Sequence, residues 1–437
     1  MLTRNRLFLA LAGSLLLLFL LWAFSSVTIR SSPPADPKLG ITNEQLADIE
    51  DRQRAPDSAI DYARLDSRLQ MLMERDSMVG LAVGIVEDGE IRFLKGYGVT
   101  MAGSSDPVGT DTVFRWASLS KGVAADMVAL LAAKNELSLY EPVGKYTSTL
   151  RLPGGNEHKA TISDLLSHRL GLFAHANDSK LEDNFDPKYL RSTLASLNAI
   201  CSPGQCHAYQ NVAYDAASEV VEKVTGRPYA EIVRERLFLP LGMSSATMTR
   251  QGLMSAASWA RPHRGGKNSK PLEVAEAYYR VPAAGGVNSS IKDLAAWMQA
   301  QMGVDPQILP DSVLQAVQSP RVRTRNQMRK FRERIPVANY GLGWRVYDFA
   351  GHRVIGHHGG VSGYRSLILF DPLRKAGVVA LWNNSGTSQP NGLEIEVMDM
   401  LYRLPPRDWL GLETDPKAPP VEEEPDNAQV DTGGTAR

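Results

Sequence analysis

The sequence is poor in cysteine and has no excess of charge of either sign. Its 437 residues include two cysteines, and 48 lysines and arginines balance 48 aspartates and glutamates. This balance argues against a nucleic-acid-binding protein, because such proteins present a basic surface to phosphates. The sequence also lacks repeats of the solenoid kind. Hydrophobic residues make up 43% of the chain, which is enough for a sizeable core.

Several common catalytic motifs are missing as well. The chain has no G-x-S-x-G, which disfavours an α/β-hydrolase triad, and no H-E-x-x-H or Walker A motif. His357 and His358 are adjacent, so on a strand they would point to opposite faces and chelate a metal poorly. We therefore expect neither a metal nor a cofactor.

The longest hydrophobic run lies near the N-terminus. Residues 7–24 carry no charge and follow Arg4 and Arg6. As a helix these roughly 18 residues would span about 27 Å, which is close to the thickness of a bilayer core. We expect residues 1–28 to be the anchor of a single-pass cell-membrane protein with its main domain exported to the periplasmic side. A cleaved signal segment, leaving a secreted or periplasmic protein, is the alternative.

Two further segments have a composition unlike that of a packed core. Residues 29–56 begin as a proline-rich linker, and residues 406–437 are a proline-rich acidic tail that we expect to be disordered. The folded domain is therefore expected to span residues 57–405. Within it, Cys201 and Cys206 flank a Pro-Gly turn and predict a small disulfide hairpin rather than a metal site.

Hydrophobic patterning places strands near both ends of this domain. Strand-like segments occur at residues 81–86, 91–94, 343–347, 353–355, 364–370 and 377–382. Helical spacing occurs at residues 57–73, 123–134, 212–224, 229–238, 291–302 and 393–404. This order predicts an α+β fold in which one antiparallel sheet, built from both ends of the domain, is flanked by helices. A mostly helical region, about residues 122–285, is inserted between them.

The first candidate chemical motif is S-x-x-K, at Ser118 and Lys121. At the start of a helix these two residues share one face, so the amine is placed to take the proton of the hydroxyl. The lysine acts as a base only if burial or nearby positive charge lowers its pKa. A second S-x-x-K, at Ser289–Lys292, we interpret as a helix N-cap with a solvated lysine.

Two more motifs follow Ser118 in the chain. Tyr209-Gln210-Asn211 is a Y-x-N, and His357-His358-Gly359 is an H-x-G on a probable strand. The order S-x-x-K, Y-x-N, H-x-G resembles the serine β-lactamase and penicillin-binding-protein family, in its class C β-lactamase and DD-peptidase branch. The similarity extends over about residues 57–405 and includes the segments LLSHRLGL at 165–172, PLGM at 240–243 and YGLGW at 340–344.

This resemblance implies a β-lactamase/DD-peptidase-like fold and a role for each matching residue. Ser118 would be the acylated nucleophile, and Lys121 and Tyr209 would share the proton transfer. Asn211 and His357 would contact the substrate. The backbone N–H groups of Ser118 and Gly360 would form the oxyanion hole, with Gly359 beside them on the strand. His168 we interpret as structural.

The third motif departs from the lysine, threonine and glycine of the β-lactamases. Here His357 and His358 stand where those enzymes have a cation and a hydroxyl. The resemblance thus implies a serine hydrolase that acts through an acyl-enzyme on small peptides, esters or β-lactams, with D-amino-acid peptides of peptidoglycan as the expected substrate and the cell wall as the expected partner. A carboxylesterase, a class C-like β-lactamase and a non-catalytic cell-wall binding module are the alternatives.

The basic segment from Arg321 to Arg334 is the last feature. It contains six arginines and one lysine between Pro320 and Pro336. We interpret it as a solvated face, with attraction to anionic lipid or cell-wall polymer as the alternative.

Overall fold

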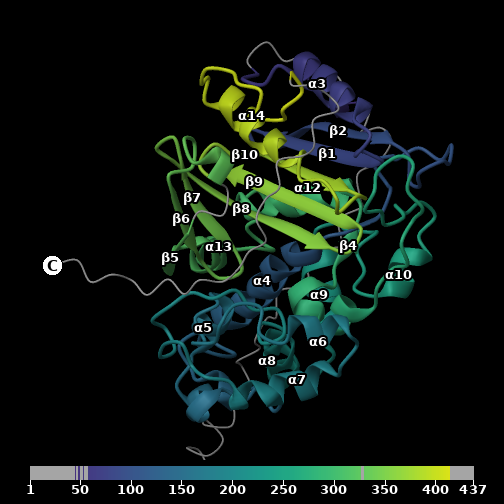
Figure 1. The fold of residues 1–437 in the computed structure, drawn as a ribbon. Helices are drawn as coiled ribbons and strands as arrows, with labels where there is room; N and C mark the ends of the chain where they lie inside the picture. Colours follow the sequence, from purple (N-terminus) through teal and green to yellow (C-terminus); the bar gives the residue numbers. More distant parts are fainter. Residues whose placement is uncertain (1–44, 46–47, 50–52, 54–57, 326–328, 414–437) are drawn as a thin grey trace, which may run out of the picture. The chain divides into compact units, whose positions relative to one another are not determined.

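The computed structural model describes residues 45, 48–49, 53, 58–325 and 329–413 (Figure 1). The expected segment 1–28, most of the linker and the acidic end of the tail lie outside these residues. The expected boundaries of the segments remain predictions. Trp409 and Leu410 are buried, so the packed chain continues beyond residue 405.

An antiparallel sheet of eight strands crosses the domain (Figure 1). Its order is β2 (Glu90–Gly98), β1 (Gly80–Glu87), β10 (Ala376–Trp382), β9 (Tyr364–Asp371), β8 (His352–Val361), β7 (Arg345–Phe349), β6 (Val337–Tyr340) and β5 (Val322–Thr324). The first hairpin pairs with the last strand, Leu81 opposite Trp382, so both ends of the domain meet in one sheet. A separate two-stranded ladder joins β3 (Phe114–Arg115) to β4 (Asn288–Ser289).

The chain between β2 and β5 contains many short helices joined by turns and irregular segments. The α-helices there are α4 (Ser120–Ala133), α5 (Ile162–Leu166), α6 (Asp178–Glu182), α7 (Pro187–Thr193), α8 (Ala216–Thr225), α9 (Tyr229–Val233), α10 (Arg250–Met254), α11 (Pro282–Gly285), α12 (Ile291–Gln301) and α13 (Asp311–Gln318). Short 3-10 or π turns lie at η1 (Ala117–Leu119), η2 (Val143–Lys145), η3 (Pro153–His158), η4 (Leu194–Ser196), η5 (Arg234–Phe238), η6 (Ala277–Arg280) and η7 (Arg329–Phe331). The remaining helices, α3 (Tyr62–Glu74) and α14 (Asn391–Leu401), flank the sheet segments at the two ends.

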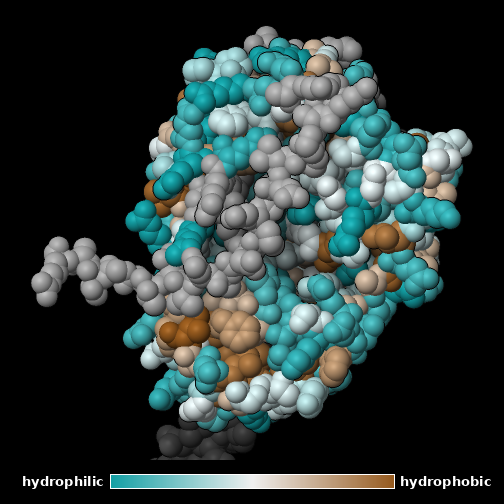
Figure 2. Space-filling view, viewed as in Figure 1, coloured by the Kyte–Doolittle hydropathy of each residue, from teal (hydrophilic) through white to brown (hydrophobic). Residues whose placement is uncertain are grey.

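The sheet separates two hydrophobic cores. On one face α3 and α14 pack against the strands, with Leu69, Phe93 and Ile395 among the buried residues. On the other face α12 lies against the strands, and the core there, which includes Trp116, Trp297 and Trp344, extends to α4. Figure 2 shows that one side of the molecule is largely hydrophilic, with hydrophobic residues gathered over the helical segments in the lower half of the view. The predicted α+β fold, with one sheet from both ends and helices on its faces, is confirmed.

The prediction of a single-pass membrane protein is corrected. None of the helices within the described residues is long and apolar enough to cross a bilayer. The longest of them, α4, has 14 residues, whereas a membrane span needs about 20. Residues 7–24, on which the prediction relied, lie outside the described residues.

The sequence pattern also missed part of the sheet edge. Residues 322–324 form β5 and residues 337–340 form β6, although the surrounding segment was interpreted as a solvated basic face. Arg334 of that segment is buried, and its Nε lies 2.7 Å from Oδ1 of Asp399 in α14. The interpretation is therefore wrong for Arg334, because its charge is neutralised inside the fold.

Candidate active site

Ser118 lies in a tight turn between strand β3 and helix α4. The turn is η1, and Ala117 before the serine has a positive φ of 49°, a conformation that costs a non-glycine residue energy. Two bonds hold this turn: Trp116 N–H donates to Val287 O at 2.9 Å, and Ser366 Oγ donates to Trp116 O at 2.7 Å. Ser118 is half-buried, so its hydroxyl is held in place yet accessible.

Helix α4 is fixed beneath Ser118 by close packing on tryptophans. A Cβ at Gly122 would lie 2.7 Å from the ring of Trp297 and 2.8 Å from that of Trp344, so only glycine fits. The rings of Trp116 and Trp297 are 5.2 Å apart, and those of Trp297 and Trp344 are 5.0 Å apart. This rigid layer holds Ser118 and Lys121 in a fixed relation.

Lys121 is fully buried in the first turn of α4. Its Nζ donates to Asn211 Oδ1 at 2.7 Å and to Ala284 O at 2.9 Å, and it lies 3.4 Å from Ser118 Oγ. Burial lowers the pKa of Lys121 to about 7, although the negative charges of Asp178 and Asp215 act to raise it. A neutral amine has two N–H groups and one lone pair. The two acceptors take the N–H groups, which leaves the lone pair for the serine hydroxyl.

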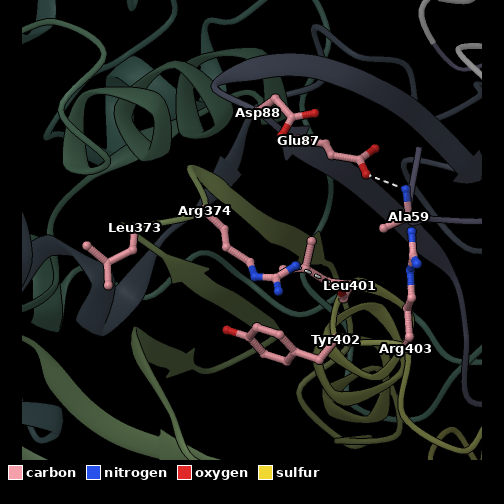
Figure 3. A pocket seen from close by; sticks show the side chains of 8 residues that line it. All are labelled: Ala59, Glu87, Asp88, Leu373, Arg374, Leu401, Tyr402 and Arg403. Carbon is pink, nitrogen blue, oxygen red and sulfur yellow. Dashed lines mark hydrogen bonds between the residues drawn. The ribbon is translucent and has the colours of Figure 1, made fainter. Parts of the chain in front are cut away.

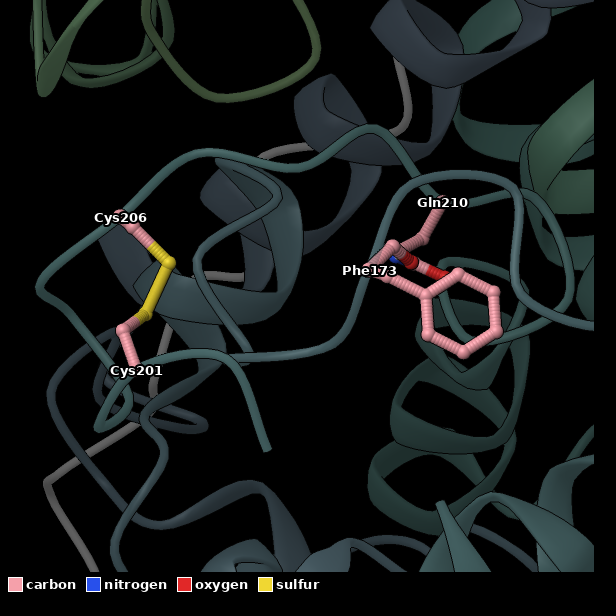
Figure 4. The surroundings of a disulfide bond; sticks show 4 residues. All are labelled: Phe173, Cys201, Cys206 and Gln210. Carbon is pink, nitrogen blue, oxygen red and sulfur yellow. A yellow bond between two sulfur atoms is a disulfide. The ribbon is translucent and has the colours of Figure 1, made fainter. Parts of the chain in front are cut away.

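The Y-x-N loop forms one wall beside this pair. The ring of Tyr209 lies 4.7 Å from Lys121 Nζ, and Asn211 Nδ2 donates to Asp178 Oδ2 at 2.6 Å. The Cys201–Cys206 disulfide, which the sequence predicts, closes the hairpin just before this loop (Figure 4). Within the loop, Gln210 Nε2 donates to Phe173 O at 2.6 Å.

Strand β8 forms the opposite wall and touches the Ser118 turn directly. A Cβ at Gly359 would lie 2.2 Å from both Trp116 O and Ser366 Oγ and 3.2 Å from Ala117 Cβ, so a side chain is excluded there. This contact packs strand β8 against the turn that carries Ser118. Gly360 itself is exposed.

The two histidines of the H-x-G motif point to opposite faces of the sheet, as the sequence predicts. His357 is buried, and its Nε2 lies 3.0 Å from the hydroxyl of Tyr340. His358 Nε2 lies 2.9 Å from Oε1 of the buried Glu394 in α14. Burial and the nearby cations Arg345 and Lys121 hold the pKa of His357 well below its usual value. His357 is therefore neutral at pH 7.

Sequence reasoning missed two residues at this site, His168 and Tyr340. The ring of His168 lies 4.2 Å from that of Tyr209, and its Nε2 lies 3.2 Å from Tyr340 Oη. The interpretation of His168 as structural stays a prediction. Both residues lie in the segments LLSHRLGL and YGLGW, which were noted only as parts of the family resemblance.

The second S-x-x-K has a different structure. Ser290 accepts from Asp293 N–H as the N-cap of α12, as predicted. The lysine, however, is buried rather than solvated, and Lys292 Nζ pairs with Asp111 Oδ1 at 2.7 Å. Its charge is therefore neutralised by a carboxylate, unlike that of Lys121.

A cavity of about 560 Å³ lies away from Ser118, at the turns β1–β2 and β9–β10 (Figure 3). Glu87, Asp88, Arg374 and Arg403 line it with both signs of charge, and none of the predicted site residues reaches it. Among the described residues, no group of three or more His, Cys, Asp and Glu side chains is arranged to hold a metal ion.

A protein-family model named Beta-lactamase matches residues 65–399 of the chain. The chain belongs to the β-lactamase family. It is 26% identical over 341 residues to an unguisins hydrolase of Aspergillus campestris, covering 74% of this chain and 62% of that protein. It is 28% identical to penicillin-binding protein 4 of Amycolatopsis lactamdurans, covering 75% of this chain and 86% of that protein. It is 32% identical to the esterase EstB of Burkholderia gladioli, covering 43% of this chain and 51% of that protein.

Solved structures of this family share the fold. A penicillin-binding protein homologue from Pyrococcus abyssi, described as octameric, has a TM-score of 0.71 at 24% identity and covers 80% of each chain. A D-stereospecific amidohydrolase from Streptomyces has a TM-score of 0.62 at 24% identity, covering 77% of this chain and 98% of that one. The family is one of serine hydrolases. The chain spans less than two thirds of the unguisins hydrolase.

Proposed function

We propose that this protein is a serine hydrolase that forms a covalent acyl-enzyme on Ser118. The observation that carries the proposal is the environment of Lys121: a buried amine with a pKa near 7, two backbone or amide acceptors for its N–H groups, and Ser118 Oγ at 3.4 Å. In its neutral form Lys121 takes the hydroxyl proton while Ser118 Oγ attacks the substrate carbonyl. Tyr209 shares the proton transfer to the leaving group.

The backbone N–H groups of Ser118 and Gly360 are proposed to bind the oxyanion of the tetrahedral intermediate. The close approach of Gly359 to Trp116 O and Ala117 Cβ supports this, because it brings strand β8 against the turn that carries Ser118. Asn211 is proposed to contact the amide of the substrate.

The proposed substrates are amides or esters, with D-amino-acid peptides of peptidoglycan first. Relatives named as a penicillin-binding protein and a D-stereospecific amidohydrolase support this class. A carboxylesterase is the second candidate, favoured by the absence of a cation from the third motif: His357 is neutral, and His358 faces Glu394 on the far side of the sheet. The same feature disfavours efficient hydrolysis of β-lactams, which carry a carboxylate.

The test is labelling by a fluorescent penicillin followed by intact mass measurement, with Ser118→Ala as the control. A stable adduct that the variant loses supports the peptidase. Rapid turnover of the penicillin points to a β-lactamase, and labelling by activated esters alone points to the esterase. If neither class of reagent labels the protein, the acyl-enzyme proposal is rejected in favour of a non-catalytic binding module.

A further inference from the structure

A series of hydrogen bonds connects the Y-x-N loop to strand β8. It begins at the backbone N–H of Gln210, between Tyr209 and Asn211, which donates to His168 Nδ1 at 3.1 Å. From His168 Nε2 it passes at 3.2 Å to the hydroxyl of Tyr340, and from there at 3.0 Å to His357 Nε2. It ends at 2.7 Å between His357 Nδ1 and the backbone carbonyl of His358.

The backbone groups at the two ends of this series of hydrogen bonds determine where each of its protons lies. An amide N–H can only donate, so His168 Nδ1 is an acceptor and its Nε2 carries the proton. A carbonyl can only accept, so His357 Nδ1 carries its proton and Nε2 is an acceptor. Tyr340 therefore accepts from His168 and donates to His357. All bonds point the same way, from the Y-x-N loop to strand β8.

This direction requires both histidines to be neutral. A protonated His357 would place a second donor against Tyr340 and leave the tyrosine proton without an acceptor. Burial lowers the pKa of both rings well below the usual value, and the charged or titratable groups around them act the same way, namely Lys121, Arg345, His207 and His358. The relay is thus complete at neutral pH.

We propose that His168, Tyr340 and His357 form a positioning relay that sets the Tyr209–Asn211 loop at a fixed distance from the oxyanion strand β8. This inference rests on the proposed function of the site. Tyr340 and His168 touch no substrate in this arrangement; they act through the backbones of Gln210 and His358. His357 accordingly supplies an acceptor for Tyr340 and does not replace the cation of the β-lactamases.

The decisive measurement is the tautomer of each ring, read by long-range ¹H–¹⁵N NMR of histidine-labelled protein at pH 7 without substrate. We expect His168 in the Nε2–H form and His357 in the Nδ1–H form, assigned with His168→Gln and His357→Gln. The opposite tautomer of either ring, or a protonated ring, overturns the relay. Because no turnover is measured, this result does not depend on the acyl-enzyme proposal.

Two variants then test the role of the relay. Tyr340→Phe removes the central hydroxyl, and we expect kcat for an activated ester to fall about 10- to 100-fold with a smaller change in KM, because small misplacements at a site are costly. The matched control is Tyr364→Phe, which loses a buried hydroxyl that donates to Ala260 O at 2.7 Å, away from the relay. Equal kcat in Tyr340→Phe and wild type would contradict a positioning role.

His357→Lys separates the relay from the alternative role of a cation. A protonated lysine can only donate, so it opposes the donor of His168 across Tyr340, and we expect activity to fall at least as far as in Tyr340→Phe. A lysine that preserves or raises activity would show that His357 stands for the family's cation and would overturn the relay. Circular dichroism of each variant checks that the fold is retained.

Discussion

Lys121 donates a hydrogen bond of 2.7 Å to the side-chain oxygen of Asn211, across 90 positions of the sequence. This bond and the one to Ala284 O account for two of the three directions around the lysine nitrogen. The third direction faces Ser118. The bond makes Lys121 a candidate base, because it holds the amine in a buried position where the neutral form is favoured.

Replacing Lys121 by arginine removes the lone pair of the neutral amine, because a guanidinium does not lose its proton in proteins. We expect the rate of acylation of Ser118 to fall by about 10²- to 10⁴-fold, the usual range for a lost general base. Stopped-flow labelling by a fluorescent penicillin or an activated ester measures the rate. The matched control is Lys292→Arg in the second S-x-x-K, which can still pair with Asp111. Similar losses in both variants would refute a special role for Lys121.

The acylation rate should depend on pH through Lys121. Its pKa is lowered to about 7, so below this pH the amine is protonated and cannot accept the serine proton. The rate therefore rises with pH and levels off above about 7. The negative charge of Asp178 acts to raise the pKa of Lys121, so Asp178→Asn should move the rising limb to lower pH. The control is Asp186→Asn, which changes an exposed helix cap and should leave the rising limb in place. A rising limb that also stays in place in Asp178→Asn would contradict the assignment to Lys121.

Gly359→Ala should separate β8 from the Ser118 turn. The new Cβ would lie 2.2 Å from Trp116 O, so the strand or the turn must shift. We expect a loss of about 1–3 kcal/mol in the free energy of unfolding, as for other overpacked sites, together with a loss of acylation. Urea unfolding measures the loss in the free energy of unfolding. Gly109→Ala is the control, since a Cβ there meets no atom within 4 Å. Wild-type stability in Gly359→Ala would show that the contact is loose.

The Cys201–Cys206 disulfide should stabilise the hairpin that leads into the Y-x-N loop. Loop-closure entropy for so short a loop suggests a contribution of about 2 kcal/mol to the free energy of unfolding. A Cys201→Ser, Cys206→Ser double variant should lose about this amount in urea unfolding, and reduced wild-type protein should match it. A double variant as stable as the oxidised protein would mean that the surrounding backbone bonds alone hold the hairpin.

The sequence predicted the central strands well and the sheet edge poorly. Segments 364–370 and 377–382 are long and apolar because they are buried on both faces of the sheet, and each coincides closely with an observed strand. Strand β5 has three residues with arginine at its centre, so it carries almost no pattern. Its hydrogen bonds come from β6, which only the assembled sheet provides.

The sequence by itself determined which residues are available for the chemistry. Ser118 and Lys121 are three positions apart, so one turn of helix brings them together whatever surrounds it, and the order of the three motifs identifies the family. Only the tertiary structure decided the protonation of the groups at the site. The pKa of Lys121 depends on its burial beside Asn211 and Ala284. The tautomer that we propose for His168 depends on the backbone N–H of Gln210. Desolvation and hydrogen-bond direction are properties of neighbours that are distant in the chain.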